Sequence, residues 1–240
     1  SGPVPLKKLE EYQTFEEFYD GYKALLDYYL DLSVKAQYHS YEVMNQHVSF
    51  LFTSLLTDDC IARGKALLDG GVRYLGGTNE TYGNINTSDS LWVIRDLVFN
   101  QKKYTLRQLN DAMLANFNGY EALRKDCLNC DKYGNDLETA DTMANDLYEF
   151  VAKGVRNRGI AIGMQYFLIV ISNNQLNTEW GNRTAASPDG RLSCMYMNPA
   201  NNPQGGANKS GPTAMLNSLA KFDAKYHGGS VQNIKFSPSM

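Results

Sequence analysis

Apolar residues recur at helical spacing through the first part of the chain. Between residues 14 and 57 they stand three or four positions apart, which is the pattern of the core-facing side of a helix. Thr14 followed by Glu17 has the form of a capping box, the usual mark of a helix start. We therefore predict one long helix over 14–57. Its apolar side is formed by Phe15, Phe18, Tyr22, Leu25, Leu26, Tyr29 and Leu30.

The pattern predicts further helices up to residue 156, separated by turns. A loop is predicted over 76–88, because this stretch is rich in Gly, Asn and Thr. Its only charge is Glu80, which suggests that it packs against other parts of the protein. Two more helix starts have the form of capping boxes, Thr105 with Gln108 and Asn135 with Glu138. The predicted helices span 58–68, 90–99, 105–116, 120–127 and 135–156.

The last third of the chain has a different pattern. Residues 160–172 are mostly apolar and rich in β-branched and aromatic side chains, which favours a buried strand. A helix is predicted over 211–222 and a short final strand over 230–236. The fold class is therefore α/β and helix-rich. No linker divides the chain, so we treat 1–240 as one unit, with 1–157 mainly helical and 158–240 mixed.

A turn-rich run over 185–214 is the most distinctive stretch of sequence. Ser187-Pro188-Asp189-Gly190 has the composition of a β-turn, and Gly205-Gly206 allows the backbone to pass close to another group. The two glycines could also hold an anion through their backbone N–H groups. Ser210 followed by Pro212 is typical of a helix start.

Composition excludes several classes of protein. The net charge is −3 and no block of Lys or Arg is present, so we expect no nucleic-acid partner. No apolar run reaches the roughly 18 residues of a membrane span, and we expect no membrane partner. Four cysteines in 240 residues are too few for a disulfide framework, which favours a reducing, cytoplasmic location.

Generic chemical motifs are weak in this chain. Cys127 and Cys130 form a CxxC pair, but no second pair completes a zinc site, and we expect no metal. The pair also ends a predicted helix, whereas a redox CxxC lies where a strand meets a helix. The three histidines have no ligand spacing, and His227 is expected in a turn. No nucleotide-binding glycine loop or nucleophile-elbow motif is present.

The run 185–214, taken together with several earlier blocks, resembles the glycyl radical enzymes. This family comprises pyruvate formate-lyase and its dehydratase, decarboxylase and lyase relatives. The blocks follow the family order along nearly the whole chain. They are 14–18, 59–65, 70–74, 89–99, 104–106, 116–121, 132–136 and 230–236. In the run itself, the motif residues are Asp189, Gly190, Arg191, Gly205, Gly211 and Thr213.

The resemblance implies a fold and a chemistry. Family members are ten-stranded α/β barrels, of which this chain would be a segment. Their glycyl radical is installed by a radical S-adenosylmethionine activating enzyme and generates a thiyl radical on a cysteine loop. That loop lies upstream of the block matching 14–18, and the glycine lies in an Arg-Val-x-Gly-Tyr-like loop near the C-terminus. This sequence contains neither, and Cys60 matches a structural cysteine of the family. We therefore expect no catalytic residue and no cofactor in this chain, and no activity from it alone.

The resemblance also implies a substrate region. The segment from Tyr196 through Asn198 and Asn201 to Asn202 is expected at the substrate end of the barrel, where it would contact a small polar molecule. Gly211-Pro212-Thr213-Ala214 favours a dehydratase, decarboxylase or C–N or C–S lyase, whereas Asn201-Asn202-Pro203 resembles the formate-lyase, acetyltransferase branch. A third alternative is a truncated homologue that serves as a non-enzymatic subunit. A partial barrel leaves strand edges uncovered, so we also expect self-association.

Overall fold

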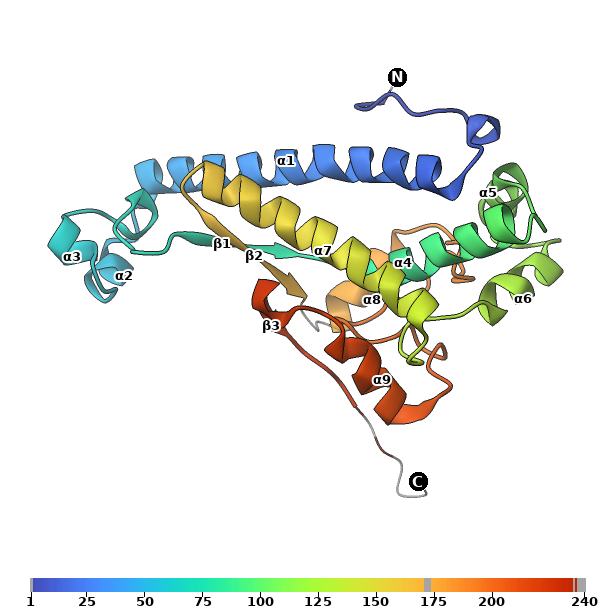
Figure 1. Cartoon of the computed structure of the whole chain (residues 1–240). Helices are drawn as coiled ribbons and strands as arrows, with labels where there is room; N and C mark the ends of the chain where they lie inside the picture. Colours follow the sequence, from blue (N-terminus) through green and yellow to red (C-terminus); the bar gives the residue numbers. More distant parts are fainter. Residues whose placement is uncertain (1, 171–173, 235, 237–240) are drawn as a thin grey trace.

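The computed structural model describes residues 2–170, 174–234 and 236 (Figure 1). A three-stranded parallel sheet with the order β1-β2-β3 joins distant parts of the chain. Its strands are β1 (Gly76–Glu80), β2 (Gln165–Val170) and β3 (His227–Ser230). Parallel neighbours need crossover connections, and here helices supply them. The α/β, helix-rich class is confirmed for the described part of the chain.

The long first helix ends earlier than predicted. α1 (Phe15–His47) stops before Ser49 and Phe50, which both adopt positive φ, and a short α2 (Leu51–Leu55) follows. Neither Gly nor Pro marks this break, so the apolar pattern could not locate it. Thr14 caps the helix as predicted, accepting a bond from the Glu17 N–H at 3.2 Å. The second bond of a capping box, from the Thr14 N–H to the Glu17 carboxylate, does not form, because this carboxylate accepts from the Gln13 N–H instead.

The prediction of a continuous helix over 58–68 is also wrong. In this region only α3 (Cys60–Arg63) and a 3-10 turn, η2 (Leu67–Asp69), form. A separate 3-10 turn, η1 (Leu9–Glu11), precedes α1. Gly64 adopts φ +61° and ends α3, so this glycine was a stop signal that the pattern did not use.

The predicted loop over 76–88 contains β1 and the start of α4 (Asn84–Val93). Gly, Asn and Ser disfavour both strand and helix in isolation. Here, however, β1 pairs with β2 over five residues, and the polar side chains at the start of α4 are buried and hydrogen-bonded. Tertiary hydrogen bonds therefore override local preference. α4 continues into a π-helical segment, η3 (Ile94–Asn100).

Three helices follow, of which two have the predicted starts. α5 (Leu106–Leu114) begins with the reciprocal Thr105–Gln108 capping box, which confirms that prediction. α6 (Glu121–Asn129) ends two residues beyond the predicted end at residue 127, and Cys130 is its C-cap. α7 (Glu138–Ala161) extends five residues beyond the predicted Arg156. Asn135 does not cap it, because its side chain binds the backbone of residues 132, 207, 209 and 210 instead.

The last third differs from the prediction at its ends. β2 lies within the predicted strand 160–172, of which residues 171 and 172 lie outside the described residues. α8 (Asn174–Asn182) was not predicted. α9 (Gly211–Ala220) and a 3-10 turn, η4 (Ala224–Tyr226), precede β3. The predicted final strand over 230–236 is misplaced, because β3 ends at Ser230 and the described residues beyond it form no strand; residue 235 lies outside them.

The main core lies between α1, η3, α5, α6 and α7. The long helix α1 runs across α7 along one side of the molecule, and β3 and α9 lie at the opposite side (Figure 1). Among the core side chains, Phe15 contacts Phe99, and Leu97 and Leu147 are almost completely buried. No helix among the described residues is long and apolar enough to span a membrane.

Candidate functional site

The predicted substrate segment is hydrogen-bonded to the N-terminal end of α4. Asn86 on α4 and Asn198 on the segment hold each other reciprocally: the Asn198 N–H donates to Asn86 Oδ1 at 2.8 Å, and the Asn86 N–H donates to Asn198 Oδ1 at 3.2 Å. Asn86 Nδ2 also donates to Asp189 Oδ2 at 2.6 Å and to Gln204 Oε1 at 3.1 Å. Asn86, which the sequence reasoning missed, is therefore the centre that fixes this segment.

Asn201 connects the segment to β3 through a series of part-buried hydrogen bonds. It is fully buried, and its Oδ1 accepts from Asn84 Nδ2 at 2.9 Å. Its Nδ2 lies 2.9 Å from His227 Nε2, and His227 Nδ1 lies 3.0 Å from the Tyr148 hydroxyl. The series thus runs from Asn84 through Asn201 and His227 to Tyr148 on α7. His227 is the first residue of β3, so it does not lie in the turn that the sequence predicts.

The hydrogen bonds that join the imidazole to Asn201 and Tyr148 fix the tautomer of His227. The Tyr148 hydroxyl donates its one hydrogen to the Asp223 carbonyl at 2.8 Å, so it can only accept from the imidazole. His227 therefore carries its hydrogen on Nδ1, and Nε2 accepts from the Asn201 amide. Burial lowers the pKa of His227, which favours this neutral ring.

The two remaining predicted substrate residues have different surroundings. Asn202 is buried, its Nδ2 donates to the Asn233 carbonyl at 3.2 Å, and its Oδ1 has no partner among the described residues. It lines a cavity of about 300 Å³ together with Pro212, Met215 and Ile234. Tyr196 is 44% exposed, and its hydroxyl lies against Gly205, where an added Cβ would come within 2.0 Å of it. The predicted close approach at Gly205 is present.

The family-motif residues form the framework around this segment. Gly190 closes the predicted turn, with its N–H donating to the Ser187 carbonyl at 3.0 Å. Asp189 accepts from Ser187 and from the Arg191 N–H. The buried Arg191 guanidinium donates to backbone carbonyls, including that of Met195 at 2.9 Å. Gly211 starts α9 at φ +84°, and Thr213 is exposed on the same helix.

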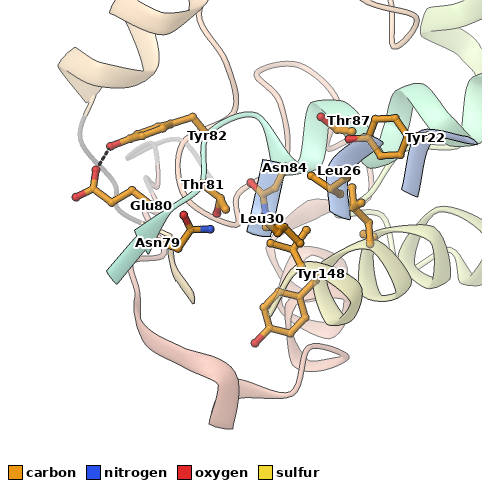
Figure 2. A pocket seen from close by; sticks show the side chains of 13 residues that line it. Tyr22, Leu26, Leu30, Asn79, Glu80, Thr81, Tyr82, Asn84, Thr87 and Tyr148 are labelled. Carbon is orange, nitrogen blue, oxygen red and sulfur yellow. Dashed lines mark hydrogen bonds between the residues drawn. The ribbon is translucent and has the colours of Figure 1, made fainter. Parts of the chain in front are cut away.

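A pocket of about 280 Å³ lies beside this series of hydrogen bonds, where β1 ends and α4 begins (Figure 2). Apolar side chains of α1 and α7 form one side of it, and polar residues of 79–87 form the other. Asn84 and Tyr148 belong both to this lining and to the series of hydrogen bonds. The apolar lining consists of Leu26, Leu30, Ala144, Leu147 and Val151, and the polar lining includes Tyr22, Asn79, Glu80, Thr81, Tyr82, Asn84, Thr87 and Tyr148.

Glu80, the last residue of β1, and Tyr82 form a hydrogen-bonded pair in the lining of the pocket. The Tyr82 hydroxyl donates to the Glu80 carboxylate, as the dashed line in Figure 2 shows. Burial and this bond raise the pKa of Tyr82 to about 12, so the phenol keeps its proton at neutral pH. Next to the pair, the buried Thr81 Oγ1 has no partner among the described residues. The pocket therefore offers hydrogen-bonding groups of the kind that orient a small polar ligand.

The CxxC pair lies away from this pocket and is not set up for thiolate chemistry. Burial raises the pKa of Cys127 to about 12 and that of Cys130 to about 11, so both remain thiols at neutral pH. Lys132 donates to the carbonyls of both residues and caps the end of α6. In the described part of the chain, no three His, Cys, Asp or Glu side chains gather as a metal site would require.

Sequence reasoning did not single out four residues that the structure brings to this candidate site: Glu80, Tyr82, Asn84 and Asn86. It treated 76–88 as a loop, although it noted that a stretch with a single charge should be packed. That low charge was the available signal. A run of Asn, Ser and Thr without surface charge is unusual unless its side chains make buried hydrogen bonds, and here they do.

Comparison with protein families matches almost the whole chain. A model described as pyruvate formate lyase-like matches residues 2–176, and one described as glycine radical matches 197–240. Trans-4-hydroxy-L-proline dehydratase of Clostridioides difficile is 31% identical over 95% of this chain and 29% of its own. (2S)-3-sulfopropanediol dehydratase of Klebsiella oxytoca is 29% identical over 95% of this chain and 28% of its own.

Solved structures agree with these sequence relatives. The Clostridioides difficile hydroxyproline dehydratase, solved with trans-4-hydroxy-L-proline bound, superposes with a TM-score of 0.87 at 31% identity. The glycerol-bound, B12-independent glycerol dehydratase of Clostridium butyricum gives 0.86 at 28%. Each match covers 92% of this chain and 28% of the solved one, so the chain spans less than a third of its relatives. With both family models matched in order, the chain belongs to the pyruvate formate-lyase-like family of glycyl radical enzymes.

Proposed function

We propose that this chain is a segment of a glycyl radical enzyme that removes water or another small group from a small polar substrate. The observation that carries the proposal is the 31% identity to a dehydratase along 95% of the chain. The matched relatives also include an isethionate sulfite-lyase and a 4-hydroxyphenylacetate decarboxylase subunit, which fits the dehydratase, decarboxylase and lyase branch. The glycine-radical match supports a glycyl radical in the whole protein, installed by an activating enzyme.

The three parallel strands fit a place in the wall of a larger barrel. Among the described residues, β1 and β3 each pair only with β2, so further strands could continue the sheet on either side. We propose that 1–240 is one unit of a ten-stranded barrel. Because the sequence has no Arg-Val-x-Gly-Tyr-like loop, the radical is supplied from beyond this segment. The unpaired cysteines fit a cytoplasmic protein.

The polar residues of this chain would orient the substrate while the radical supplies hydrogen abstraction. We propose that Tyr196 and Asn202 contact substrate directly, since one is partly exposed and the other has a free amide oxygen beside a cavity. Asn198 and Asn201 are buried and hydrogen-bonded to α4, which suits residues that hold the substrate segment in position. The Tyr82 hydroxyl donates its hydrogen to Glu80, so toward a substrate hydroxyl in the pocket it can act as a hydrogen-bond acceptor.

The test uses the whole protein, activated under anaerobic conditions by its radical S-adenosylmethionine enzyme. We expect a glycine-centred radical by electron paramagnetic resonance and loss of water, or of another small group, from a member of a panel of small diols, hydroxyproline and hydroxysulfonates. The 240-residue chain alone should turn over none of them. Cleavage of pyruvate with coenzyme A would instead support the formate-lyase branch, which Asn201-Asn202-Pro203 resembles. Absence of any radical would favour a non-enzymatic subunit.

A matched pair of variants tests the pocket itself. Tyr82→Phe removes this hydroxyl acceptor, and we expect kcat/KM to fall about tenfold, as for the loss of one hydrogen bond to the substrate. Tyr104→Phe is the control, because its hydroxyl also donates to a carboxylate, Asp126, but lies outside the pocket. Equal losses in the two variants would remove Tyr82 from the substrate site.

A further inference from the structure

A second cavity, of about 360 Å³, lies apart from the pocket of Figure 2. It is enclosed by the end of α6, the loop that follows it, the 189–191 turn and the 204–209 loop. Four cationic side chains contribute to its lining: Arg124, Lys132, Arg191 and Lys209. Two carboxyl groups, Asp89 and Asp189, also contribute. The lining therefore has an excess of positive charge.

Not all of these cations are available to a ligand. The Arg191 guanidinium is engaged with the Ser187 hydroxyl and with backbone carbonyls, and Lys132 caps α6. Arg124 uses its Nε to bind the Gly190 carbonyl at 2.9 Å, and its two terminal nitrogens have no partner among the described residues. The exposed Lys209 ammonium likewise has none in that part of the chain. Arg124 and Lys209 are thus the cations that can pair with a guest.

The glycine pair provides further donors at the same cavity. Gln204 to Ala207 form a tight turn, closed by the Ala207 N–H donating to the Gln204 carbonyl at 2.9 Å, with Gly206 at φ +83°. The Gly205 and Gly206 N–H groups have no acceptor among the described residues. Consecutive unpaired N–H groups of this kind form a concavity that suits an anion.

Asp89 supplies the independent sign of a missing partner. It is 1% exposed, and its Oδ1 accepts from the Tyr133 N–H at 2.9 Å, but its Oδ2 has no partner among the described residues. Burial raises the pKa of Asp89 to about 8; Asp189 and Asp141 act in the same direction, and Lys132 opposes them. At neutral pH the carboxyl therefore keeps a proton and can donate it in a hydrogen bond.

We propose that this cavity is a binding site for a small oxyanion, held by Arg124 and Lys209, by the Gly205 and Gly206 N–H groups, and by the Asp89 carboxyl. The shared chemistry is that of a carboxylate, phosphate or sulfate group. None of the site's groups lines the pocket beside β1, whereas Gly205 and Gly206 also line the cavity at Asn202. The site also gives a role to the glycine pair of the turn-rich run.

Isothermal titration calorimetry of the 240-residue chain tests the site with sulfate, phosphate and acetate at constant ionic strength. We expect saturable binding of at least one of these anions. Tighter binding of sulfate or phosphate would indicate a tetrahedral ligand group, and tighter binding of acetate would indicate a carboxylate. Lys209→Gln and Arg124→Gln should each weaken it at least tenfold. Lys125→Gln removes the same charge from an exposed neighbour on α6 that does not line the cavity, and it should change affinity less than twofold. Heat that never saturates, or equal losses for Lys125→Gln and Lys209→Gln, would overturn the proposal.

The pH dependence of sulfate binding gives a second readout, since sulfate itself does not titrate near neutral pH. Binding to the unmodified chain should weaken as the pH rises through about 8, where Asp89 loses its proton. Asp89→Asn keeps a donor at this position without an ionisable group, so its affinity should stay level across the same range. A decline of equal size in both proteins would remove Asp89 from the site.

Discussion

At the scale of single residues, the candidate site depends on a few buried polar side chains whose hydrogen bonds leave little freedom. Asn86 holds three positions of the run 185–214, more than a hundred residues away in sequence, through Asp189, Asn198 and Gln204. His227 has both ring nitrogens engaged, one with Asn201 and one with Tyr148. The neutral imidazole makes both of these hydrogen bonds, whereas protonation of Nε2 removes the acceptor for Asn201. The stability of the fold should therefore depend on pH.

The first prediction concerns His227. Its pKa is lowered in the folded chain by burial, so the unfolded chain binds more protons as the pH falls below the ordinary histidine range. The free energy of unfolding should therefore decrease as the pH falls from about 7 to about 5. Urea unfolding across this range measures it, and His227→Gln should flatten the curve. Nitrogen NMR of the imidazole should show the hydrogen on Nδ1; a hydrogen on Nε2 would contradict the assignment.

The second prediction compares two glycines with positive φ. Gly134 adopts φ +91°, and an added Cβ would lie 2.2 Å from Pro203 Cγ, whereas Gly119 adopts φ +79° with open space around it. Both alanine variants strain the backbone, at a cost of about 1 kcal/mol. Gly134→Ala should cost about 1–3 kcal/mol more, because it also overpacks the contact with Pro203. Chemical unfolding measures the difference, and equal losses would mean that Pro203 moves aside.

At the scale of elements, apolar periodicity predicted the helices better than it predicted their ends. The Thr105–Gln108 box marked α5 correctly, because both of its bonds are local. Asn135 failed as a cap because Lys209 and Ser210, more than seventy residues away, take its side-chain oxygen. β1 and the start of α4 were missed for the same reason: contacts distant in sequence stabilise residues that favour neither strand nor helix. The candidate site could be found only as far as the family motif reached.

Lys221 provides the third prediction, since it joins α9 to α7. Its ammonium lies 2.7 Å from the fully buried carboxylate of Asp141 and 3.1 Å from the more exposed Asp136. The pKa of Lys221 is raised, chiefly by its hydrogen bond to Asp141. Lys221→Met should destabilise the chain by about 1–3 kcal/mol, because it leaves Asp141 buried without its cation. The control Asp136→Asn should cost less than about 1 kcal/mol. A larger loss for the control would contradict this ranking.

At the scale of the whole molecule, the segment leaves apolar surface uncovered beyond the end of α1. Five large side chains around α2 are each more than half exposed: Val48, Leu51, Phe52, Leu55 and Leu56. Among the described residues, β1 and β3 also leave one side of each strand unpaired. Soluble proteins seldom leave such patches and edges open, because both promote association. In the whole protein, we expect other parts of the barrel to cover them.

The fourth prediction is that the isolated 240-residue chain self-associates. Light scattering at working concentration should show dimers or larger species, and Phe52→Ser with Leu56→Ser should shift the distribution toward monomer. Leu114→Ser is the control, because Leu114 is 79% exposed but lies on α5, away from the patch. A monodisperse monomer before any substitution would contradict this expectation.

The central claim is that this chain is one segment of a larger radical enzyme, and the most direct test is the DNA sequence on both sides of its codons. We predict an in-frame cysteine codon upstream, at the position of the family's cysteine loop. We also predict an Arg-Val-x-Gly-Tyr-like run in frame downstream. A start codon immediately before Ser1 with a stop codon immediately after Met240 would contradict it, since such a protein could carry neither group.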